Sequence, residues 1–396
     1  MSRKDWDVRG NISDAKTLPR RVFTDPSVHS NLLNTWYRTE WLTLPLHHYL
    51  KRETRDAKAV WEGLEVPGAS ERIEYLGEPL LLKRDTKPET NPALHCVLGV
   101  CPHNGGSLQD EETDTRHLPF FKCPFHGLIT DCAGSFKAFP GLQNPTLEQR
   151  KALSLKQYHI QVWRDFLFLC RGNPIAPWNA VFDPLTQIVS RMPLEQLRYT
   201  PHAKEVRRVP INPLLQADNH CDWLHIQGGV HGGEEGLEGA IKMKKYRWKP
   251  FDHMLLQWAY AVNSEDGFDP QCLPKWLLDD EDPTSRVYAV WLFQPPNVAW
   301  NFYNWGLSLN VYNPVPGNPE ETEFLWTHYV WDQKEYAKAQ GMLYRVDEED
   351  ISELTQVQKN MKVDPNHRGV FGPTNEMGRY WLHRRVSQMM LAQSKS

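Results

Sequence analysis

The chain has 396 residues, enough for two domains that each bury a hydrophobic core. Apolar residues make up 40% and charged residues 24%, as in globular proteins, and the net charge of -4 gives no reason to expect nucleic acid or an anionic membrane as a partner. No apolar run is long enough for a membrane span or a signal peptide, and the seven scattered cysteines do not suggest a disulfide framework, so we expect a cytoplasmic protein.

The first part of the chain is typical of a small all-β domain. Strands are predicted at Glu78–Asp85, Ala93–Val100 and Ile160–Cys170, with turn residues at 87–92 between the first two. Gly172–Pro177 then has the composition of a domain boundary. We therefore expect an N-terminal arm at residues 1–40 and a β domain at 41–172.

The second part, residues 173–396, mixes helical and strand patterns. Helices are predicted at Asn212–His225, Tyr336–Met361 and Glu376–Ala392, and apolar strands at Met254–Val262, Val287–Phe293 and Trp300–Tyr312. Such an arrangement predicts an α+β domain with a mostly antiparallel sheet flanked by helices.

Two short motifs in the β domain carry metal-binding side chains. C-x-H is followed by C-x2-H, with residues 104–122 between them, and the ligand candidates are Cys101, His103, Cys123 and His126. A Rieske [2Fe–2S] cluster needs two cysteines on one iron and two histidines on the other, so each motif can supply one of each. A structural zinc site is the alternative, although zinc motifs more often open with two cysteines. Cys96 and Cys101 are spaced like the start of a ferredoxin motif, but no C-x2-C follows.

A second group of histidines lies early in the other domain. Asp222 and His225 are three residues apart and would share one face of a predicted helix. A glycine pair at 228–229 then breaks the helix and lets His231 turn back towards the same point. Two histidines and one carboxylate on one side of Fe(II) leave positions open for dioxygen and substrate. An alternative register uses His220 with His225.

Both motifs resemble those of the Rieske non-haem iron oxygenases, the family of the aromatic-ring-hydroxylating oxygenase alpha subunits. CPHNGGSL with CPFHG is similar to the family's cluster motif, which implies the four ligands named above. Asn219, Asp222, His225 and His231 resemble its N-x2-D-x2-H-x4-H motif with one extra residue, so the register with His220 would lose two matches. The resemblance implies that His225 and His231 bind the mononuclear iron.

The third iron ligand implied by the resemblance is Asp350. Asp350 and Gln358 lie in a predicted helix and resemble the family's late carboxylate motif. The alternative is an acidic helix face in solvent, since four other acids crowd the same stretch: Asp347, Glu348, Glu349 and Glu353. In the family, the aspartate equivalent to Asp222 bridges a cluster histidine of the neighbouring subunit to an iron histidine, which implies the path His126, Asp222, His225.

The resemblance also implies a fold and an activity. The fold would be a small domain with two cluster-binding loops on β-hairpins and a larger catalytic domain of helix-grip type. The protein would activate dioxygen at Fe(II) to hydroxylate a small organic, aromatic substrate by mono- or dioxygenation. Electrons would come from NAD(P)H through a separate reductase, with or without a ferredoxin, because the chain has no G-x-G-x-x-G motif. The expected assembly is a homotrimer or a multiple of one, with or without a small β subunit.

Other functions stay open on the sequence alone. The stretch Val298–Tyr312 (VAWNFYNWGLSLNVY) resembles the branch of the family that acts on quaternary ammonium compounds, and the sixteen tryptophans would suit a cation–π cage. A monooxygenase or demethylase for such a compound is therefore the alternative enzyme. A zinc- or cluster-binding interaction or electron-transfer protein is the alternative class. The glycines from 228 to 239 predict a mobile loop near the iron, a candidate substrate gate.

Overall fold

The computed structural model describes residues 6–8, 10–50, 64, 67–86, 93–108 and 118–393, so the predicted turn at 87–92 lies outside the described residues. The chain divides into two compact units, a smaller one at Trp41–Ile175 and a larger one made of Met1–Glu40 and Ala176–Ser396. The residues expected to form an N-terminal arm are thus part of the larger unit. Each unit is described by itself below.

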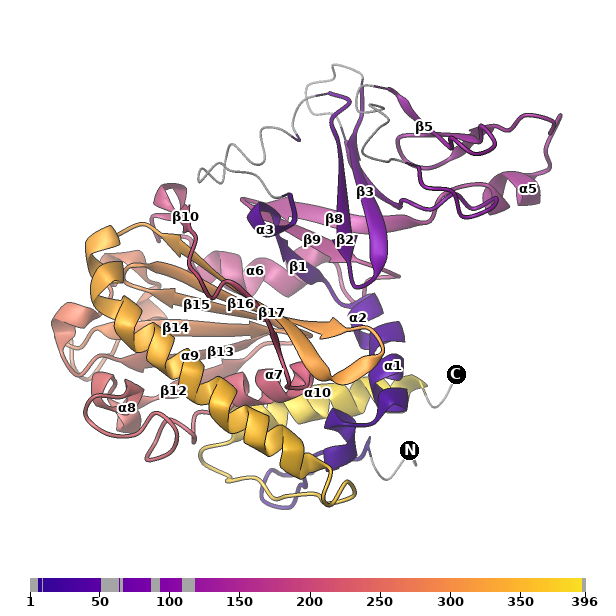
Figure 1. Ribbon diagram of the computed structural model, residues 1–396. Helices are drawn as coiled ribbons and strands as arrows, with labels where there is room; N and C mark the ends of the chain where they lie inside the picture. Colours follow the sequence, from indigo (N-terminus) through magenta and orange to yellow (C-terminus); the bar gives the residue numbers. More distant parts are fainter. Residues whose placement is uncertain are drawn as a thin grey trace. The chain divides into compact units, whose positions relative to one another are not determined.

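The smaller unit is built from two antiparallel sheets (Figure 1). The first sheet has the strand order β1-β9-β8-β4-β3-β2, and the second has the order β5-β6-β7. Short helices accompany them in the described part of the unit: α3 (Leu46–Leu50) and α5 (Leu147–Ala152). The strands are β1 (Leu42–Pro45), β2 (Ser70–Tyr75), β3 (Glu78–Arg84), β4 (Leu94–Leu98), β5 (Phe120–Lys122), β6 (Ile129–Asp131), β7 (Phe136–Ala138), β8 (Gln157–Trp163) and β9 (Phe166–Cys170).

One predicted strand of this unit is a hairpin. The single strand expected at Ile160–Cys170 was wrong, because the chain reverses between Trp163 and Phe166, which face each other across β8 and β9. Arg164 in the turn has a φ of 54°, a left-handed conformation that a continuous strand does not contain. All five residues of β9 are buried, which gave the apolar run its continuous appearance in the sequence.

The larger unit is organised around an eight-stranded antiparallel sheet. Its order is β10-β17-β16-β15-β14-β13-β12, and β11 also pairs with β17. The strands are β10 (Arg198–Thr200), β11 (Val206–Val209), β12 (Arg247–Pro250), β13 (Leu255–Tyr260), β14 (Val287–Gln294), β15 (Val298–Tyr303), β16 (Gly306–Val315) and β17 (Asn318–Val330). The fold class predicted from the sequence, a small all-β domain followed by a larger α+β domain with an antiparallel sheet, is confirmed.

The strand predicted at Trp300–Tyr312 is also a hairpin, formed by β15 and β16. Tyr303 pairs with Gly306, so Asn304 and Trp305 form the turn. A Cβ atom on Gly306 would lie 2.2 Å from the carbonyl oxygen of Tyr329 on the next strand, which only glycine avoids. The turn was not predicted from the sequence, because one of its two residues is a buried tryptophan, which is not typical of turns.

Helices of very different lengths complete the larger unit. The long helix α9 lies across one face of the sheet in Figure 1, and α7 and α10 pack against each other beside it. The helices are α1 (Pro26–Asn34), α2 (Trp36–Thr39), α6 (Trp178–Ile188), α7 (Pro213–Cys221), α8 (Leu237–Ala240), α9 (Gln333–Met361) and α10 (Met377–Gln393). Short 3₁₀ helices are η2 (Arg20–Phe23), η3 (Leu194–Gln196), η4 (Met243–Lys245), η5 (Ser264–Asp266), η6 (Pro270–Cys272) and η7 (Lys275–Leu277).

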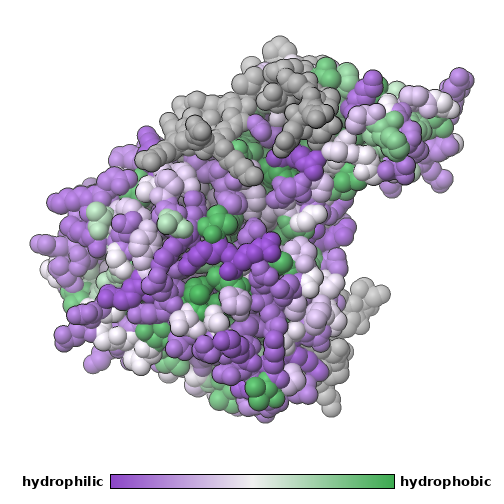
Figure 2. Space-filling model, viewed as in Figure 1, coloured by the Kyte–Doolittle hydropathy of each residue, from purple (hydrophilic) through white to green (hydrophobic). Residues whose placement is uncertain are grey.

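Figure 2 shows a mostly hydrophilic face with isolated hydrophobic residues between the polar ones. Within the described part of the chain, no helix combines the length and apolar character that crossing a membrane requires.

A buried ion cluster fixes α7 to α10. Asp218 on α7 is 3% exposed and accepts hydrogen bonds from the Arg379 guanidinium at 2.8 Å and the His383 imidazole at 2.9 Å. The other ring nitrogen of His383 accepts the backbone N–H of Leu18 at 2.9 Å, so the same ring also holds the N-terminal segment. Buried charges are tolerated only when they are paired in this way, and the cluster therefore sets the position of α7.

Candidate metal centres

The first candidate centre lies on two loops of the smaller unit that share one backbone conformation. Cys101 N–H donates to the Gly106 carbonyl at 2.8 Å, and Gly105 N–H donates to the Cys101 carbonyl at 2.9 Å. The second loop repeats both bonds with the same lengths, from Cys123 to Leu128 and from Gly127 to Cys123. Gly105 and Gly127 have φ values of 74° and 73°, which glycine adopts without strain.

The side chains of these loops are arranged in two layers. Cys101 and Cys123 are buried, at 3% and 1% exposure, whereas both histidines are exposed. The imidazole rings of His103 and His126 meet edge to face, with centroids 4.8 Å apart and an interplanar angle of 83°. Gly106 keeps space beside the sulfurs free, since a Cβ there would lie 3.0 Å from Cys123 Sγ. Two inner thiols and two outer imidazoles fit a cluster with one cysteine-bound and one histidine-bound iron.

The electrostatics of the thiols is consistent with a metal-bound state. Burial raises the pKa of the Cys101 thiol, and the neighbouring Cys123 raises it further. Without a cation nearby, the Cys101 thiol would therefore remain protonated at neutral pH. Positive iron favours the thiolate and reverses this preference, which is the usual condition of coordinating cysteines.

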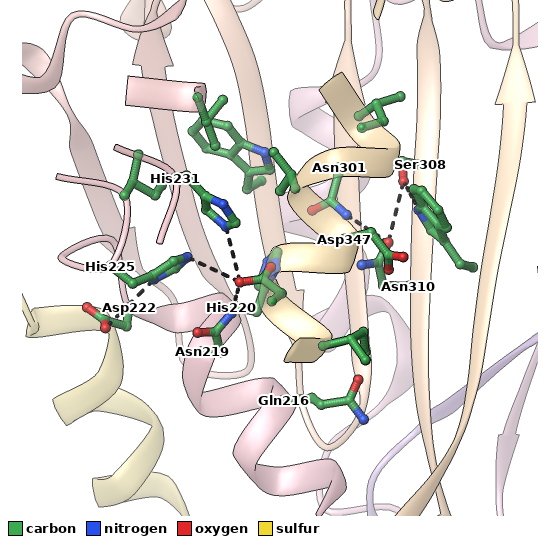
Figure 3. A pocket seen from close by; sticks show the side chains of 18 of the residues that line it. Gln216, Asn219, His220, Asp222, His225, His231, Asn301, Ser308, Asn310 and Asp347 are labelled. Atoms are coloured by element: carbon green, nitrogen blue, oxygen red, sulfur yellow. Dashed lines mark hydrogen bonds and ion pairs between the residues drawn. The ribbon is translucent and has the colours of Figure 1, made fainter. Parts of the chain in front are cut away.

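The second candidate centre lies in the larger unit, where three predicted ligands meet. His225, His231 and Asp350 each present one ligand atom, and the three atoms lie within 4.8 Å of one another. His231 Nε2 is 3.1 Å and His225 Nε2 is 4.0 Å from Asp350 Oδ1 (Figure 3). Two imidazoles and one carboxylate on one side match the donor set of a mononuclear non-haem Fe(II) site, so these residues fit the ion.

Two further side chains orient this group. Glu349 Oε2 accepts a hydrogen bond from His231 Nδ1–H at 2.8 Å. The Nε2 lone pair of His231 is therefore free to point at the centre. Asn219 Nδ2 donates to Asp350 Oδ1 at 3.0 Å. Burial works to raise the pKa of Asp350, but the hydrogen bonds and charge of the imidazoles outweigh it and lower the pKa. The carboxylate is therefore held in its ligating, ionised form.

Asp222 lies beside the centre in a way that differs from the predicted helix. The helix expected at Asn212–His225 ends at Cys221, and Asp222 is extended, with a φ of -100° and a ψ of 122°. Asp222 Oδ1 accepts the N–H of Leu224 at 2.8 Å, and α10 approaches closely because a Cβ on Gly378 would be 2.3 Å from the Cys221 carbonyl. The argument from one helix face was wrong, although Asp222 Oδ2 still lies 3.8 Å from His225 Nδ1.

The structure bears on two alternatives raised by the sequence, the ligand register with His220 and a solvated acidic face around Asp350. His220 is half-buried on α7 beside Phe293 and is not among the three residues that meet. The acidic stretch before Asp350 is not a uniformly solvated face, because Asp347 pairs with Arg207 and Glu348 pairs with Lys204. Glu349 was missed as a functional residue, since in the sequence nothing separates it from the acids around it.

Comparisons with known proteins agree with this geometry. A family model of the Rieske [2Fe-2S] domain matches residues 58–159. Choline monooxygenase of Amaranthus tricolor is 20% identical over 97% of this chain and 80% of its own length, and the enzyme of Atriplex hortensis is 21% identical over 96% and 80%. A solved quaternary ammonium Rieske monooxygenase superposes with a TM-score of 0.67 at 17% identity, covering 96% of both chains. Naphthalene 1,2-dioxygenase from Rhodococcus sp. gives 0.62 at 13% identity, covering 96% and 95%.

The chain has the fold of a Rieske oxygenase. The Rieske domain is defined by proteins in which it carries a [2Fe–2S] cluster. The paired loops of this chain lie within the residues that match the domain. The resemblance inferred from the two sequence motifs is thereby confirmed.

In this Rieske oxygenase fold, a pocket opens next to the three candidate iron ligands. Helices α7 and α9 and the strands of the large sheet supply its wall, which includes His225, His231 and Asp350 themselves. Six aromatic residues contribute ring surface: Tyr246, Trp291, Tyr303, Tyr312, Phe324 and Trp326. A small organic molecule in this pocket would lie directly beside the iron position.

The glycine-rich segment also reaches the pocket. Leu237, at the start of α8, is part of its lining, and Gly233 N–H donates to Glu238 Oε2 at 3.0 Å. Arg345 of α9 donates to the Glu235 carbonyl oxygen. These contacts fold the segment against α9, and a gating motion stays a prediction.

Proposed function

We propose that the chain is the terminal oxygenase component of a Rieske oxygenase system, which hydroxylates a small organic substrate with dioxygen. The observation that carries this proposal is the meeting of His225, His231 and Asp350 at the wall of a pocket, in a chain that also has a Rieske domain. An electron carrier would need only the first centre. A zinc-stabilised interaction module would need neither the second centre nor the pocket.

We assign the ligands as the motifs predicted them. Cys101, His103, Cys123 and His126 would hold the cluster, and His225, His231 and Asp350 would hold Fe(II). When bound, the iron supplies the chemistry that activates dioxygen, using electrons from the cluster. Asn219 and Glu349 fix the ligand side chains by hydrogen bonds at 3.0 and 2.8 Å. The apolar and aromatic wall keeps the substrate beside the iron and excludes bulk water.

We further propose that Asp222 links a cluster histidine of a neighbouring subunit to His225. His225 Nδ1 is buried and has no hydrogen-bond partner among the described residues, while Asp222 Oδ2 lies 3.8 Å away. A small rotation of the Asp222 side chain would let it accept this N–H, and its exposed edge could accept a second one. A carboxylate between two imidazoles would orient both rings and shorten the electron path.

The partners follow from the fold and from what the sequence lacks. Rieske oxygenases work with a reductase or ferredoxin and assemble into multimers. For this chain we propose a separate NAD(P)H-dependent reductase, and a homotrimer or a multiple of one as the assembly. None of the seven cysteines forms a disulfide, which fits our placement of the protein in the reducing cytoplasm.

The substrate is either an aromatic compound or a quaternary ammonium compound. The second candidate is favoured by a specific observation, the six aromatic residues that line the pocket, because ring faces attract a cation that cannot donate hydrogen bonds. The likeness to choline monooxygenases and to a quaternary ammonium monooxygenase supports the same candidate.

The test begins with anaerobically purified protein. We expect about three irons per chain, acid-labile sulfide, and after reduction the low average g value of a Rieske cluster. Oxygen uptake with NADH and a surrogate reductase would then be measured on both compound classes, with Asp350→Asn as the variant that keeps the cluster and loses one iron. A colourless protein with one zinc and no sulfide would contradict the proposal.

A further inference from the structure

The pocket contains a polar cluster that no metal ligand explains. Asn301 on β15 pairs across the hairpin with Ser308 on β16, and Asn310 lies two residues further along the same face. All three side chains line the pocket. In Figure 3 they lie on one side of the α9 segment, while His225 and His231 lie on the other.

Most hydrogen-bonding groups of this cluster are satisfied within it. Trp326 Nε1 donates to Ser308 Oγ at 2.8 Å, and Asn301 Nδ2 donates to Asn310 Oδ1 at 3.2 Å. Ser308 Oγ is 3.4 Å from Asn310 Oδ1, and Asn310 Nδ2 is 3.4 Å from the Tyr312 hydroxyl. The cluster is therefore preorganised, with its side chains fixed by one another.

One acceptor remains open. Asn301 Oδ1 is buried and has no hydrogen-bond partner among the described residues, and the residue is 6% exposed. A buried polar atom without a partner is unfavourable, so a molecule that donates a hydrogen bond to this oxygen gains relative to one that cannot. A hydrocarbon in the pocket would leave the oxygen unpaired.

The charges around the pocket restrict the ligand further. None of the described residues that line it is lysine or arginine. The nearby Asp347 is paired by two hydrogen bonds of 2.7 Å from Arg207, whose guanidinium stacks over the ring of Phe324 at 5.0 Å. Apart from the iron at His225, His231 and Asp350, the wall thus offers no cation that would pair with a carboxylate of the ligand.

We propose that Asn301, Ser308 and Asn310 form a specificity subsite that binds a hydroxyl or N–H group of the substrate. The substrate is then a small alcohol, amine or amide, neutral or positively charged, whose apolar or ammonium part packs on the aromatic wall. This inference rests on the proposed function, because it takes the pocket beside His225, His231 and Asp350 to be the substrate site. Asn301 is a specificity-determining residue in this arrangement.

The test measures binding to the iron-loaded, anaerobic enzyme, without turnover. Two matched pairs serve as probes, choline with ethyltrimethylammonium and benzyl alcohol with toluene, in each of which only the hydroxyl differs. We expect the hydroxyl compound of at least one pair to bind about tenfold tighter than its partner by titration calorimetry. Asn301→Leu should abolish the difference, Asn310→Leu should reduce it, and Asn304→Leu, in the turn of the same hairpin and outside the pocket, should keep it.

The outcomes separate this inference from the proposed function. Equal binding within both pairs, or no binding of any of the four probes, would overturn the subsite, even if the enzyme consumed oxygen on a hydrocarbon. Hydroxyl discrimination that Asn301→Leu leaves intact would also overturn it. Discrimination by a protein that takes up no iron at His225, His231 and Asp350 would instead preserve the subsite and remove the oxygenase. The wild-type comparison needs no variant, so a folding defect in Asn301→Leu cannot hide the answer.

Discussion

Replacing Glu349 by glutamine should weaken iron binding at the mononuclear centre and leave the cluster unchanged. Glu349 Oε2 accepts the Nδ1 proton of His231 at 2.8 Å, and His231 Nε2 in turn faces Asp350. The carboxylate therefore selects the tautomer that binds iron and increases the basicity of the ring. Glutamine keeps the shape and an acceptor oxygen but loses the charge.

The size of the effect follows from the exposure of the pair. A hydrogen bond to a charged group contributes about 1.5 to 3 kcal/mol. The Glu349 side chain is 34% exposed, so solvent screens part of this and we expect about 1.4 kcal/mol, or tenfold in Fe(II) affinity. Losses of this order are usual when a group that orients a metal-binding histidine is removed.

The assay is an anaerobic Fe(II) titration against a competing chelator, with the visible spectrum of the cluster recorded in parallel. Glu348→Gln is the matched control, because the neighbouring acid is 66% exposed and pairs with Lys204 instead of an iron ligand. We expect Glu348→Gln to bind iron like the wild type. An affinity for Glu349→Gln equal to that of Glu348→Gln would refute the orienting role, and so would loss of the cluster along with the iron.

Three further predictions concern stability and the cluster. Asp218→Asn removes the negative partner of the Arg379 guanidinium and the charged acceptor of the His383 N–H, and should lower the free energy of unfolding by about 1.5 to 3 kcal/mol, measured by urea titration. Gly106→Ala places a methyl group 3.0 Å from Cys123 Sγ and should reduce the cluster absorbance, whereas Gly141→Ala, with φ at 84° and no atom within 4 Å of the new carbon, should not. Burial depresses the pKa of His328 well below 6.5, so the unfolded chain binds this proton first and stability should fall as pH drops below about 6.5. Urea midpoints at pH 7.5 and 5.5 should differ less in His328→Gln, and an unchanged difference would contradict this.

The two metal motifs could be recognised from the spacing of their residues in the sequence. Ligands within one loop, such as Cys101 and His103, are only two or three residues apart in the sequence. They are therefore close in space whatever the fold. The position of Asp350 needed the fold, because it comes from α9, more than a hundred residues after His231. The motif resemblance predicted this meeting, whereas local patterns alone had no means to do so.

Reversals and helix ends were the weak points of the sequence interpretation. The two turns, Arg164–Asp165 and Asn304–Trp305, each pair one residue typical of turns with a bulky one, so two hairpins were taken for single strands. The end of α7 depends on the close approach of Gly378 from the last helix, which no local pattern near Asp222 reveals. At the end of α7 a tertiary contact thus accompanies the departure from the local helix preference.

The polar subsite could have been partly predicted. Ser308, Asn310 and Tyr312 alternate with apolar residues in the sequence, which predicts a strand with one polar face. Asn301 joins them only through the register of β15 against β16. A polar face on a strand buried on both sides is the signal that marks such a site, but recognising it requires knowing that the strand is buried.

The division of the larger unit into Met1–Glu40 and Ala176–Ser396 has a consequence for synthesis on the ribosome. The smaller unit is one continuous stretch and can fold as soon as Ile175 has emerged. The N-terminal segment must wait, because Leu18 bonds to His383 and its apolar residues pack with those of α7 and α10. At roughly 5 to 20 residues per second this wait lasts on the order of tens of seconds. During that time buried residues such as Val22 and Trp36 are without their final neighbours, so we expect this segment to be the part of the nascent chain that chaperones bind.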